Sequence, residues 1–449
     1  MATASLHRDL FYDQTFNTIF DADQRIDALL TFEKELAIVQ SAIGLIPESA
    51  ALAIENSCQS GLIDVERLTI DSAQGGNVLI ALLRQCAELL QKDESGSYNY
   101  IHFGATSQDA IDTASMIQFK KAAYWISSKL KQLIFSLAEL AQSHHRTPMI
   151  GRTFLQQAKP ITFGLKIAGW IDGFLQVFQF IDALRFPIQL GGAVGTWAGL
   201  EAQAYEKMST ALAQNLQLDK PLKPWHSQRQ PVLHIASTLG MLNGQLCKMT
   251  KDLTLMALTE IGEVNLGVPG KGVSSSMPHK NNPVNGMLIL ANGIRVPHLV
   301  ATIMDCTAAD HERALASWHA EWETMEDLFK LTAGSLRLID EILSHLVVYP
   351  DRMMANIKWT NGLVFSDVAE KAMAVKLGKI IAHDLVEKSC IESRTSGISL
   401  QTLLAGKPEV VENFSLEVLE DWFKVENNLG LSHHFTSQVL EKVKEVLGG

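Results

Sequence analysis

The chain has 449 residues, a formal net charge of -11, 47% hydrophobic residues and 19% charged residues. This composition is typical of a folded globular protein and excludes a largely disordered chain. The negative net charge argues against a general nucleic-acid binder, because phosphate contacts need a broad basic surface.

The N-terminal stretch, residues 1–13, is polar and contains no apolar run, so it does not resemble a secretory signal. The chain contains 5 cysteines, which are scattered, odd in number and without a CxxC pair. This pattern indicates neither a disulfide framework nor a zinc site. Both features favour a cytoplasmic protein.

The length exceeds one ordinary hydrophobic core, so we expect about three domains, or fewer around one extended helical bundle. A polar, turn-rich stretch at residues 93–97 favours an N-terminal helical domain over residues 1–99. A central long-helix domain is then expected over 100–349. A C-terminal helical domain is expected over 350–449, after a helix that ends at Val348.

Helical periodicity dominates the central part, while alternating strand patterns are scarce, so the sequence predicts an all-α fold. One helix begins at Pro160, which is tolerated in a first helical turn, and ends near Arg185, before Pro187. A later apolar stripe alternates spacings of four and three, as one buried helix face does. Its residues are Leu242, Leu246, Met249, Leu253 and Met256.

Two apolar stretches, Ile161–Leu190 and Met287–Ala309, raise the question of a membrane. Charged residues interrupt both stretches, and charges are costly within lipid. We therefore interpret both as buried helices of a bundle and expect no membrane segment.

Three polar segments stand apart from this packing pattern. The first, His102–Asp109, gathers hydrogen-bonding side chains ahead of a helix, where they either cap the helix or bind a carboxylate. The second, Gly151–Ala158, is expected to be a polar loop before the helix at Pro160, so capping and ligand binding are both open.

The third segment, Gly267–Val284, is rich in glycine and proline, which favours a loop that opens and closes. Its hydroxyl, lysine, histidine and asparagine side chains suit an anionic ligand and a proton transfer. A solvated surface loop is the alternative.

The glycine and lysine spacing of this segment does not fit a phosphate-binding GxxxxGK[ST] loop, and Gly191–Gly195 does not fit the dinucleotide-binding pattern GxGxxG. Without HExxH or ExxH pairs, neither a metal nor another cofactor is expected.

The third segment matches GSSxMPxKxNP, the diagnostic pattern of the fumarase/aspartase superfamily, except that Val273 replaces the glycine. The three segments occur in the order and at the separations usual there, and the resemblance extends from about residue 15 onward. It implies a helical subunit of three domains, a homotetramer with a twenty-helix core, and active sites shared between subunits.

The resemblance also implies roles for individual residues. Ser274 aligns with the loop serine regarded as the carbon base, and Lys280 and Asn282 align with residues that hold a substrate carboxylate. We add His102 as an alternative proton carrier to Ser274 and Lys280. The remaining substrate-binding candidates are Thr106, Ser107, Gln108, Thr153, Gln156, Ser275 and Arg313.

Within the superfamily, the chain resembles the cycloisomerases that interconvert 3-carboxymuconate and its lactone, in protocatechuate degradation by the β-ketoadipate pathway. These have GATSQDxIDT, an RTWLQQA-like segment and a GKGGSSxMPHKRNP-like loop. Phe154, Val273 and Asn281 are the departures, and Asn281 replaces an arginine that could contact a carboxylate. The implied substrate is a small di- or tricarboxylate.

Adenylosuccinate lyases are the nearest alternative, but they carry a histidine where this chain has Phe154 and another near Gln74–Asn77. A basic leaving group needs such an acid, whereas a carboxylate, with a pKa of about 4, leaves as a stable anion.

A helical tetramer without catalytic activity is a second alternative. The retained polar residues Ser274, Lys280 and Asn282 argue against it.

Overall fold

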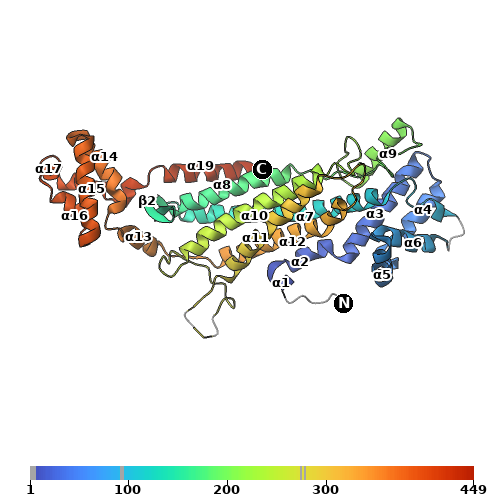
Figure 1. The fold of residues 1–449 in the computed structure, drawn as a ribbon, viewed down its shortest axis with the longest axis horizontal. Helices are drawn as coiled ribbons and strands as arrows, with labels where there is room; N and C mark the ends of the chain where they lie inside the picture. Colours follow the sequence, from blue (N-terminus) through green and yellow to red (C-terminus); the bar gives the residue numbers. More distant parts are fainter. Residues whose placement is uncertain (1–6, 92–95, 274–275, 278–279, 449) are drawn as a thin grey trace. The chain divides into compact units, whose positions relative to one another are not determined.

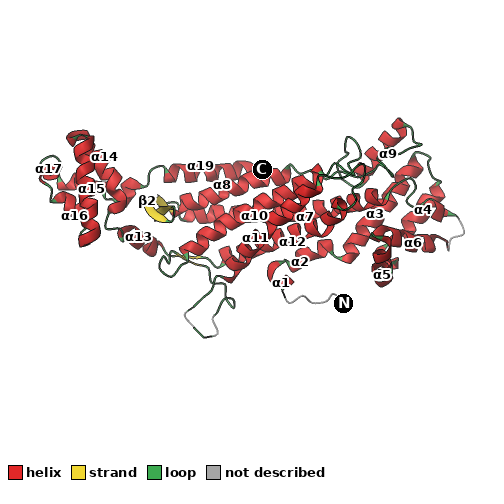
Figure 2. Cartoon of the chain, in the orientation of Figure 1, coloured by secondary structure: helices red, strands yellow, loops and turns green. Residues whose placement is uncertain are grey.

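The computed structural model describes residues 7–91, 96–273, 276–277 and 280–448. Helices make up most of this part of the chain, and its strands form two short antiparallel pairs (Figure 2). The chain divides into two compact units, each with its own core. The first comprises Met1–Lys129, Val177–Gly244 and Ala291–Arg337, and the second comprises Leu130–Gln176, Gln245–Leu290 and Leu338–Gly449.

The first unit contains the N-terminal helices and α9 (Figure 1). Their bounds are α1 Arg8–Phe11, α2 Gln14–Asn17, η1 Thr18–Phe20, α3 Ala22–Ala42, α4 Glu48–Ser57, η2 Ser60–Leu62, α5 Val65–Gly75, α6 Val78–Gln91, η3 Ser97–Asn99 and α9 Ala202–Asn215. Helix α3 packs against both α4 and α9.

The second unit contains the strands and the C-terminal helices. Their bounds are β1 Pro148–Thr153, β2 Gln156–Thr162, β3 Val264–Asn265, β4 Val347–Val348, α13 Pro350–Lys358, η4 Leu363–Phe365, α14 Ser366–Leu377, α15 Lys379–Ser396, α16 Leu400–Ala405, α17 Pro408–Val411, α18 Leu416–Trp422, η5 Val425–Asn428 and α19 Ser432–Leu447. Helices α14, α15, α16 and α18 share a small apolar core that includes Met373 and Leu404.

Five long helices contribute residues to both units. They are α7 Ser107–Ser143, α8 Phe163–Asp182, α10 Gln230–Met256, α11 Val284–Cys306 and α12 Ser317–Ser344. In the first unit the Asn243 side chain of α10 donates a hydrogen bond to Thr332 of α12 at 2.7 Å. In the second unit the Trp170 ring N–H of α8 donates to Asp252 of α10 at 2.8 Å. Polar pairs, buried in the first unit and partly buried in the second, thus connect neighbouring helices within each unit.

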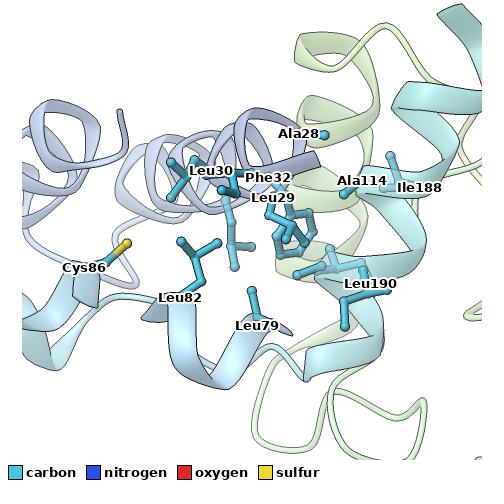
Figure 3. Packing of buried hydrophobic residues seen from close by; sticks show 14 of the residues in the cluster. Ala28, Leu29, Leu30, Phe32, Leu79, Leu82, Cys86, Ala114, Ile188 and Leu190 are labelled. Carbon is cyan, nitrogen blue, oxygen red and sulfur yellow. The ribbon is translucent and has the colours of Figure 1, made fainter. Parts of the chain in front are cut away.

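The main core of the first unit forms where α3, α6 and α7 meet the segment that contains Ile188 and Leu190 (Figure 3). Leu29, Phe32 and Leu82 are each at most 1% exposed there. Burying a large apolar side chain stabilises a fold by about 1.5–3 kcal/mol, so this core fixes the start of α7.

The predicted apolar stripe from Leu242 to Met256 is confirmed, since its five members are at most 3% exposed along α10. The expectation for Ile161–Leu190 is confirmed in part, since Phe163–Asp182 forms helix α8 and one apolar face of it is buried. The expectation for Met287–Ala309 is wrong for the single chain. Helix α11 is only 22% buried over its most apolar window and is the one described helix long and apolar enough to cross a membrane.

The predicted helix start at Pro160 is wrong. Residues 156–162 form β2, in which Pro160 faces Ile150 of β1, and α8 begins three residues later at Phe163. A two-residue turn joins the strands, with Phe154 at φ 49° and Leu155 at φ 63°. Such turns usually contain Asn-Gly or Asp-Gly, so Phe-Leu gave no sequence signal for a hairpin.

The predicted end of a helix at Val348 is also wrong. Helix α12 ends at Ser344, and Val347–Val348 pairs with Val264–Asn265 as strand β4. Adjacent β-branched residues favour extended backbone over a helical turn. The proposed limits of three domains, at residues 99 and 349, stay a prediction.

Candidate active site

The segment His102–Asp109 leads into α7, as the sequence predicts. The backbone N–H of Thr106 donates to the Asp109 carboxylate at 3.0 Å, and the Asp109 N–H donates to the Thr106 carbonyl at 2.9 Å. The first bond is the half of a capping box in which the side chain of the third helical residue reaches back to the backbone N–H before the helix, and the second is a backbone turn. The capping interpretation therefore holds for Asp109.

The Asp109 carboxylate also binds the loop that contains Gly191 and Gly192, and so holds this loop at the start of α7. It accepts hydrogen bonds from the backbone N–H groups of Gly191 and Gly192, at 3.0 and 2.8 Å, and from the His226 ring at 2.7 Å. Asp109 is fully buried, so these donors replace the water that an exposed carboxylate would bind. Asp109 and His226 thus serve the structure of the site.

A buried charge network lies one helical turn further along α7. Arg229 donates to both oxygens of Asp112, at 2.7 and 3.1 Å, and to Glu321 at 2.5 Å. The Gln108 side chain donates to Asp112 at 3.2 Å and to the His226 carbonyl at 2.9 Å. The guanidinium faces two carboxylates, and all three groups are at most 4% exposed.

The two carboxylates differ in how well they are compensated. Burial disfavours the charge on Asp112, but Arg229, with hydrogen bonds from Gln189 and Trp318, outweighs burial and holds the pKa of Asp112 below its usual value. Burial raises the pKa of Glu321 despite the contact with Arg229. Arg229 is therefore the one cation in this network that compensates the buried carboxylates of Asp112 and Glu321.

Three predicted binding residues meet beside this network. Arg313 donates to the Thr106 hydroxyl at 2.8 Å and to the Gln108 side-chain oxygen at 3.3 Å. Thr106 and Arg313 are half-buried, whereas Gln108 is buried with its amide already engaged. Thr106 and Arg313 can thus offer a hydroxyl and a cation to a carboxylate, while Gln108 orients the arginine. Ser107, the first residue of α7, is half-buried next to them.

His102 lies at the other end of the same segment. Its ring Nδ1 is 2.7 Å from a carboxylate oxygen of Glu33 in α3. Burial disfavours the charge on His102, but the attraction and hydrogen bond of Glu33, together with Asp109, outweigh burial and raise the pKa of His102 above its ordinary value. His102 has φ 56°, a left-handed conformation that is uncommon outside glycine and tends to occur at functional sites.

The second polar segment forms the hairpin of β1 and β2. Thr153 and Gln156 face one another across its turn and are exposed, and Phe154 at the tip is 98% exposed. The hairpin is anchored at Arg152, which donates to both oxygens of the buried Glu263, at 3.0 and 2.7 Å. The anchor leaves the tip side chains free for a ligand or another chain.

We expect Arg152→Lys to lower the free energy of unfolding by about 1–3 kcal/mol, because lysine cannot make the two parallel bonds to Glu263. Urea unfolding at fixed protein concentration measures this change. Arg146→Lys, an exposed arginine just before β1, is the matched control and should change stability little. Equal effects of the two substitutions would contradict the anchoring role of Arg152.

The third segment is a loop that closes on itself. Val273 and Asn281 form an antiparallel bridge, and the Asn282 backbone N–H donates to the Gly272 carbonyl at 2.9 Å. Lys280 is exposed and lines an open pocket of about 640 Å³ in the second unit, together with Asn282. Ser274 and Ser275 lie outside the described residues.

The candidate residues therefore belong to two groups. The first unit brings together His102, Thr106, Ser107, Gln108 and Arg313, and the second unit carries Thr153, Gln156, Lys280 and Asn282. In the described part of the chain, no cluster of three or more His, Cys, Asp or Glu residues is placed to hold a metal ion.

A family model described as "Lyase" matches residues 9–297, which is more than half of the chain and includes all three polar segments. The chain belongs to this lyase family. It has the mainly helical fumarase/aspartase fold that the sequence predicts.

Relatives in the lyase family match this chain over almost its full length. The 3-carboxy-cis,cis-muconate cycloisomerase of Pseudomonas putida is 37% identical over 422 residues, covering 93% of this chain and 100% of the relative. The enzyme of the same name from Acinetobacter baylyi is 34% identical over 447 residues, covering 98% and 99%. A crystal structure of 3-carboxy-cis,cis-muconate lactonizing enzyme from Pseudomonas putida superposes with a TM-score of 0.92 at 34% identity, covering 99% of this chain and 100% of that chain.

Several residues that shape the lyase-family site gave no signal in the sequence. Glu33, Arg229 and Glu263 act through partners that are 69, 117 and 111 residues away along the chain. An isolated glutamate or arginine carries no local pattern that reveals such a partner. A buried position within an apolar helix face was the one available hint, and it applies only to Glu33.

Proposed function

We propose that this lyase-family protein is a 3-carboxy-cis,cis-muconate cycloisomerase. The proposal is supported by the almost full-length similarity to enzymes of that name. The observation that carries it over a C–N lyase is Phe154, which stands where adenylosuccinate lyases have a histidine acid. A lactone-forming enzyme needs no such acid, because its leaving group in the reverse direction is a carboxylate.

In the proposed reaction, a carboxylate oxygen of the substrate forms a bond to a conjugated carbon. The π electrons shift to the carbon beside another carboxylate, and that carbon takes up a proton. Negative charge develops on the neighbouring carboxylate, which fixed cations and donors stabilise. Arg313, Thr106, His102, Lys280 and Asn282 supply these groups, and Ser274 exchanges the proton on carbon.

We further propose that the active protein is a cytoplasmic homotetramer whose sites combine segments of different subunits. The apolar surface of α11 supports this assembly. Met287 is 53%, Ile294 71% and Met304 55% exposed on the single chain, and large exposed apolar side chains along one helix fit a surface that another chain covers. The separation of the candidate residues into two groups also fits a site completed by other chains. The free cysteines fit a reducing compartment.

Mixing two inactive variants tests the shared site. Arg313→Met alters the first unit and Lys280→Met the second, so a hybrid tetramer can contain sites with both residues intact. Random mixing should restore about a quarter of the wild-type activity, since each intact position comes from a separate chain with even odds. Arg313→Met mixed with His102→Asn is the matched control and should recover nothing, because both changes affect one unit. No recovery in the first mixture would contradict sharing between chains.

Turnover of 3-carboxymuconate by the purified protein tests the function itself. We expect loss of the diene absorbance, formation of the lactone, and no fumarate from adenylosuccinate. Fumarate release from adenylosuccinate without turnover of the diene would replace the proposal by a C–N lyase. Failure with both substrates would favour a protein without either activity.

A further inference from the structure

The Glu33 carboxylate is an unusual feature of the first unit, because an acidic side chain is buried without a full set of partners. Glu33 is 1% exposed in the middle of α3. One carboxylate oxygen meets the His102 ring Nδ1 at 2.7 Å. The other oxygen is buried and has no hydrogen-bond partner among the described residues. Burying a carboxylate in this way is costly unless an ionic partner compensates it.

His102 is the ionisable partner that can compensate the charge of Glu33. Since a carboxylate only accepts hydrogen bonds, the ring donates through Nδ1 and its Nε2 is left over. The described hydrogen bonds give Nε2 no partner, and the His102 side chain is 15% exposed. The ring thus has one nitrogen committed to the core and one available to a ligand.

Among the described charged groups near this segment, Asp109 also favours the charged form of His102, and the cations Lys34 and Arg313 have partners of their own. Asp109 at the start of α7 adds a second negative charge. Lys34 is engaged by Glu55 at 2.9 Å, and contact with Cys86 holds the pKa of the nearby Cys58 thiol well above its ordinary value, so that thiol stays neutral. Arg313 is directed to Thr106 and Gln108 in the same segment.

Helix α3 also holds the backbone next to His102. The Gln40 side-chain amide donates to the Phe103 carbonyl at 2.7 Å, and Gln40 is fully buried. His102 itself is in the left-handed region at φ 56°. Two buried contacts from one helix therefore fix both the ring and the strained backbone, as pre-organised sites require.

We propose that Glu33 is a positioning residue for the cycloisomerase reaction, which keeps His102 as an imidazolium whose Nε2–H donates to a substrate carboxylate. The inference rests on the proposed function for the identity of the substrate. In this proposal the cation that meets the substrate is His102 as part of a buried pair with Glu33, and not a histidine surrounded by water. Charge-assisted hydrogen bonds of this kind strengthen as negative charge grows on the carboxylate.

Glu33→Gln tests the pair, because glutamine keeps the shape and an acceptor but removes the charge. We expect the pKa of His102 to fall, because the Glu33 carboxylate raises it in the wild type. The basic limb of the kcat profile should then move to lower pH, with kcat lowered about 10- to 100-fold at pH 8 and recovering towards the wild-type value in acid. Glu35→Gln is the matched control. Glu35 is on the same helix and accepts from Asn215 at 2.8 Å, so its loss should leave the pH profile unchanged.

The pKa of His102 can be measured without substrate, from the pH dependence of C2–H hydrogen exchange in the peptide that contains it, by mass spectrometry of the full-length protein. A wild-type His102 that titrates at or below the ordinary histidine value would overturn the proposal, even if Glu33→Gln fails to fold. A uniform loss of kcat at every pH, with the His102 pKa unchanged, would also overturn it. If the wild type does not turn over 3-carboxymuconate, the substrate assignment fails, while the exchange measurement still decides whether Glu33 charges His102.

Discussion

Replacing Arg229 by methionine is expected to lower the free energy of unfolding by about 3–5 kcal/mol, because it leaves two buried carboxylates without their cation. Asp112 and Glu321 are each 4% exposed at the side chain, and both contact this one guanidinium. Denaturant unfolding at fixed protein concentration measures the loss. Arg185→Met is the matched control, since Arg185 is 79% exposed and 3.6 Å from Asp219. This exposed pair should contribute less than about 1 kcal/mol.

The loss of stability in Arg229→Met should also depend on pH. In the wild type, the folded pKa of Asp112 lies below its usual value, so its contribution to stability is present at neutral pH and is lost as the pH falls through that folded pKa. In the variant, both buried carboxylates are expected to take up protons, so the folded variant is favoured in acid. The difference between the two proteins should therefore shrink as the pH falls. Adding Asp112→Asn and Glu321→Gln to the variant should recover part of the stability at neutral pH, and an unchanged stability would contradict this account.

Replacing Ser274 by alanine is expected to lower kcat by about 10²- to 10⁴-fold with little change in KM, the loss typical of a removed proton-transfer group. The role of Ser274 rests on the family pattern of the loop, whose base is closed by the Val273–Asn281 bridge. Steady-state kinetics with 3-carboxymuconate measures both constants.

Ser276→Ala is the matched control for the loop, because Ser276 is exposed two residues further along. It should retain most of the activity. A nearly unchanged kcat in Ser274→Ala would remove this serine from the proton transfer and leave Lys280 or His102 as the proton carrier. A rise in KM alone would make Ser274 a binding residue.

The helical fold could be predicted from the sequence because its signals are local. The stripe from Leu242 to Met256 repeats at the helical period, and the same residues are buried along α10. The hairpin escaped prediction because Phe154 and Leu155 adopt positive φ without being typical turn residues. Helix α11 has an apolar composition that suggests burial, yet much of its surface is exposed on the single chain. Composition alone does not say whether the same chain or another one covers a helix.

The candidate site was predictable only where a family pattern marks it. Thr106 and Arg313 were both selected from the sequence, and the structure brings them to 2.8 Å. Polarity in the same pattern did not distinguish ligand-binding residues from structural ones, since Asp109 and Gln108 are buried and engaged within the fold. Glu33 and Glu321 acquire their importance from distant partners, which only the folded chain brings together.

The exposed hairpin tip has a consequence for how new activities arise in this fold. Phe154 is held on a turn whose backbone is set by strand pairing and by the buried anchor at Arg152, while its own side chain packs against almost nothing within the subunit. A different side chain at this position would leave the interior of the chain intact. A single amino-acid substitution can thus replace the aromatic ring by an acid–base group and alter the chemistry, while the fold stays the same.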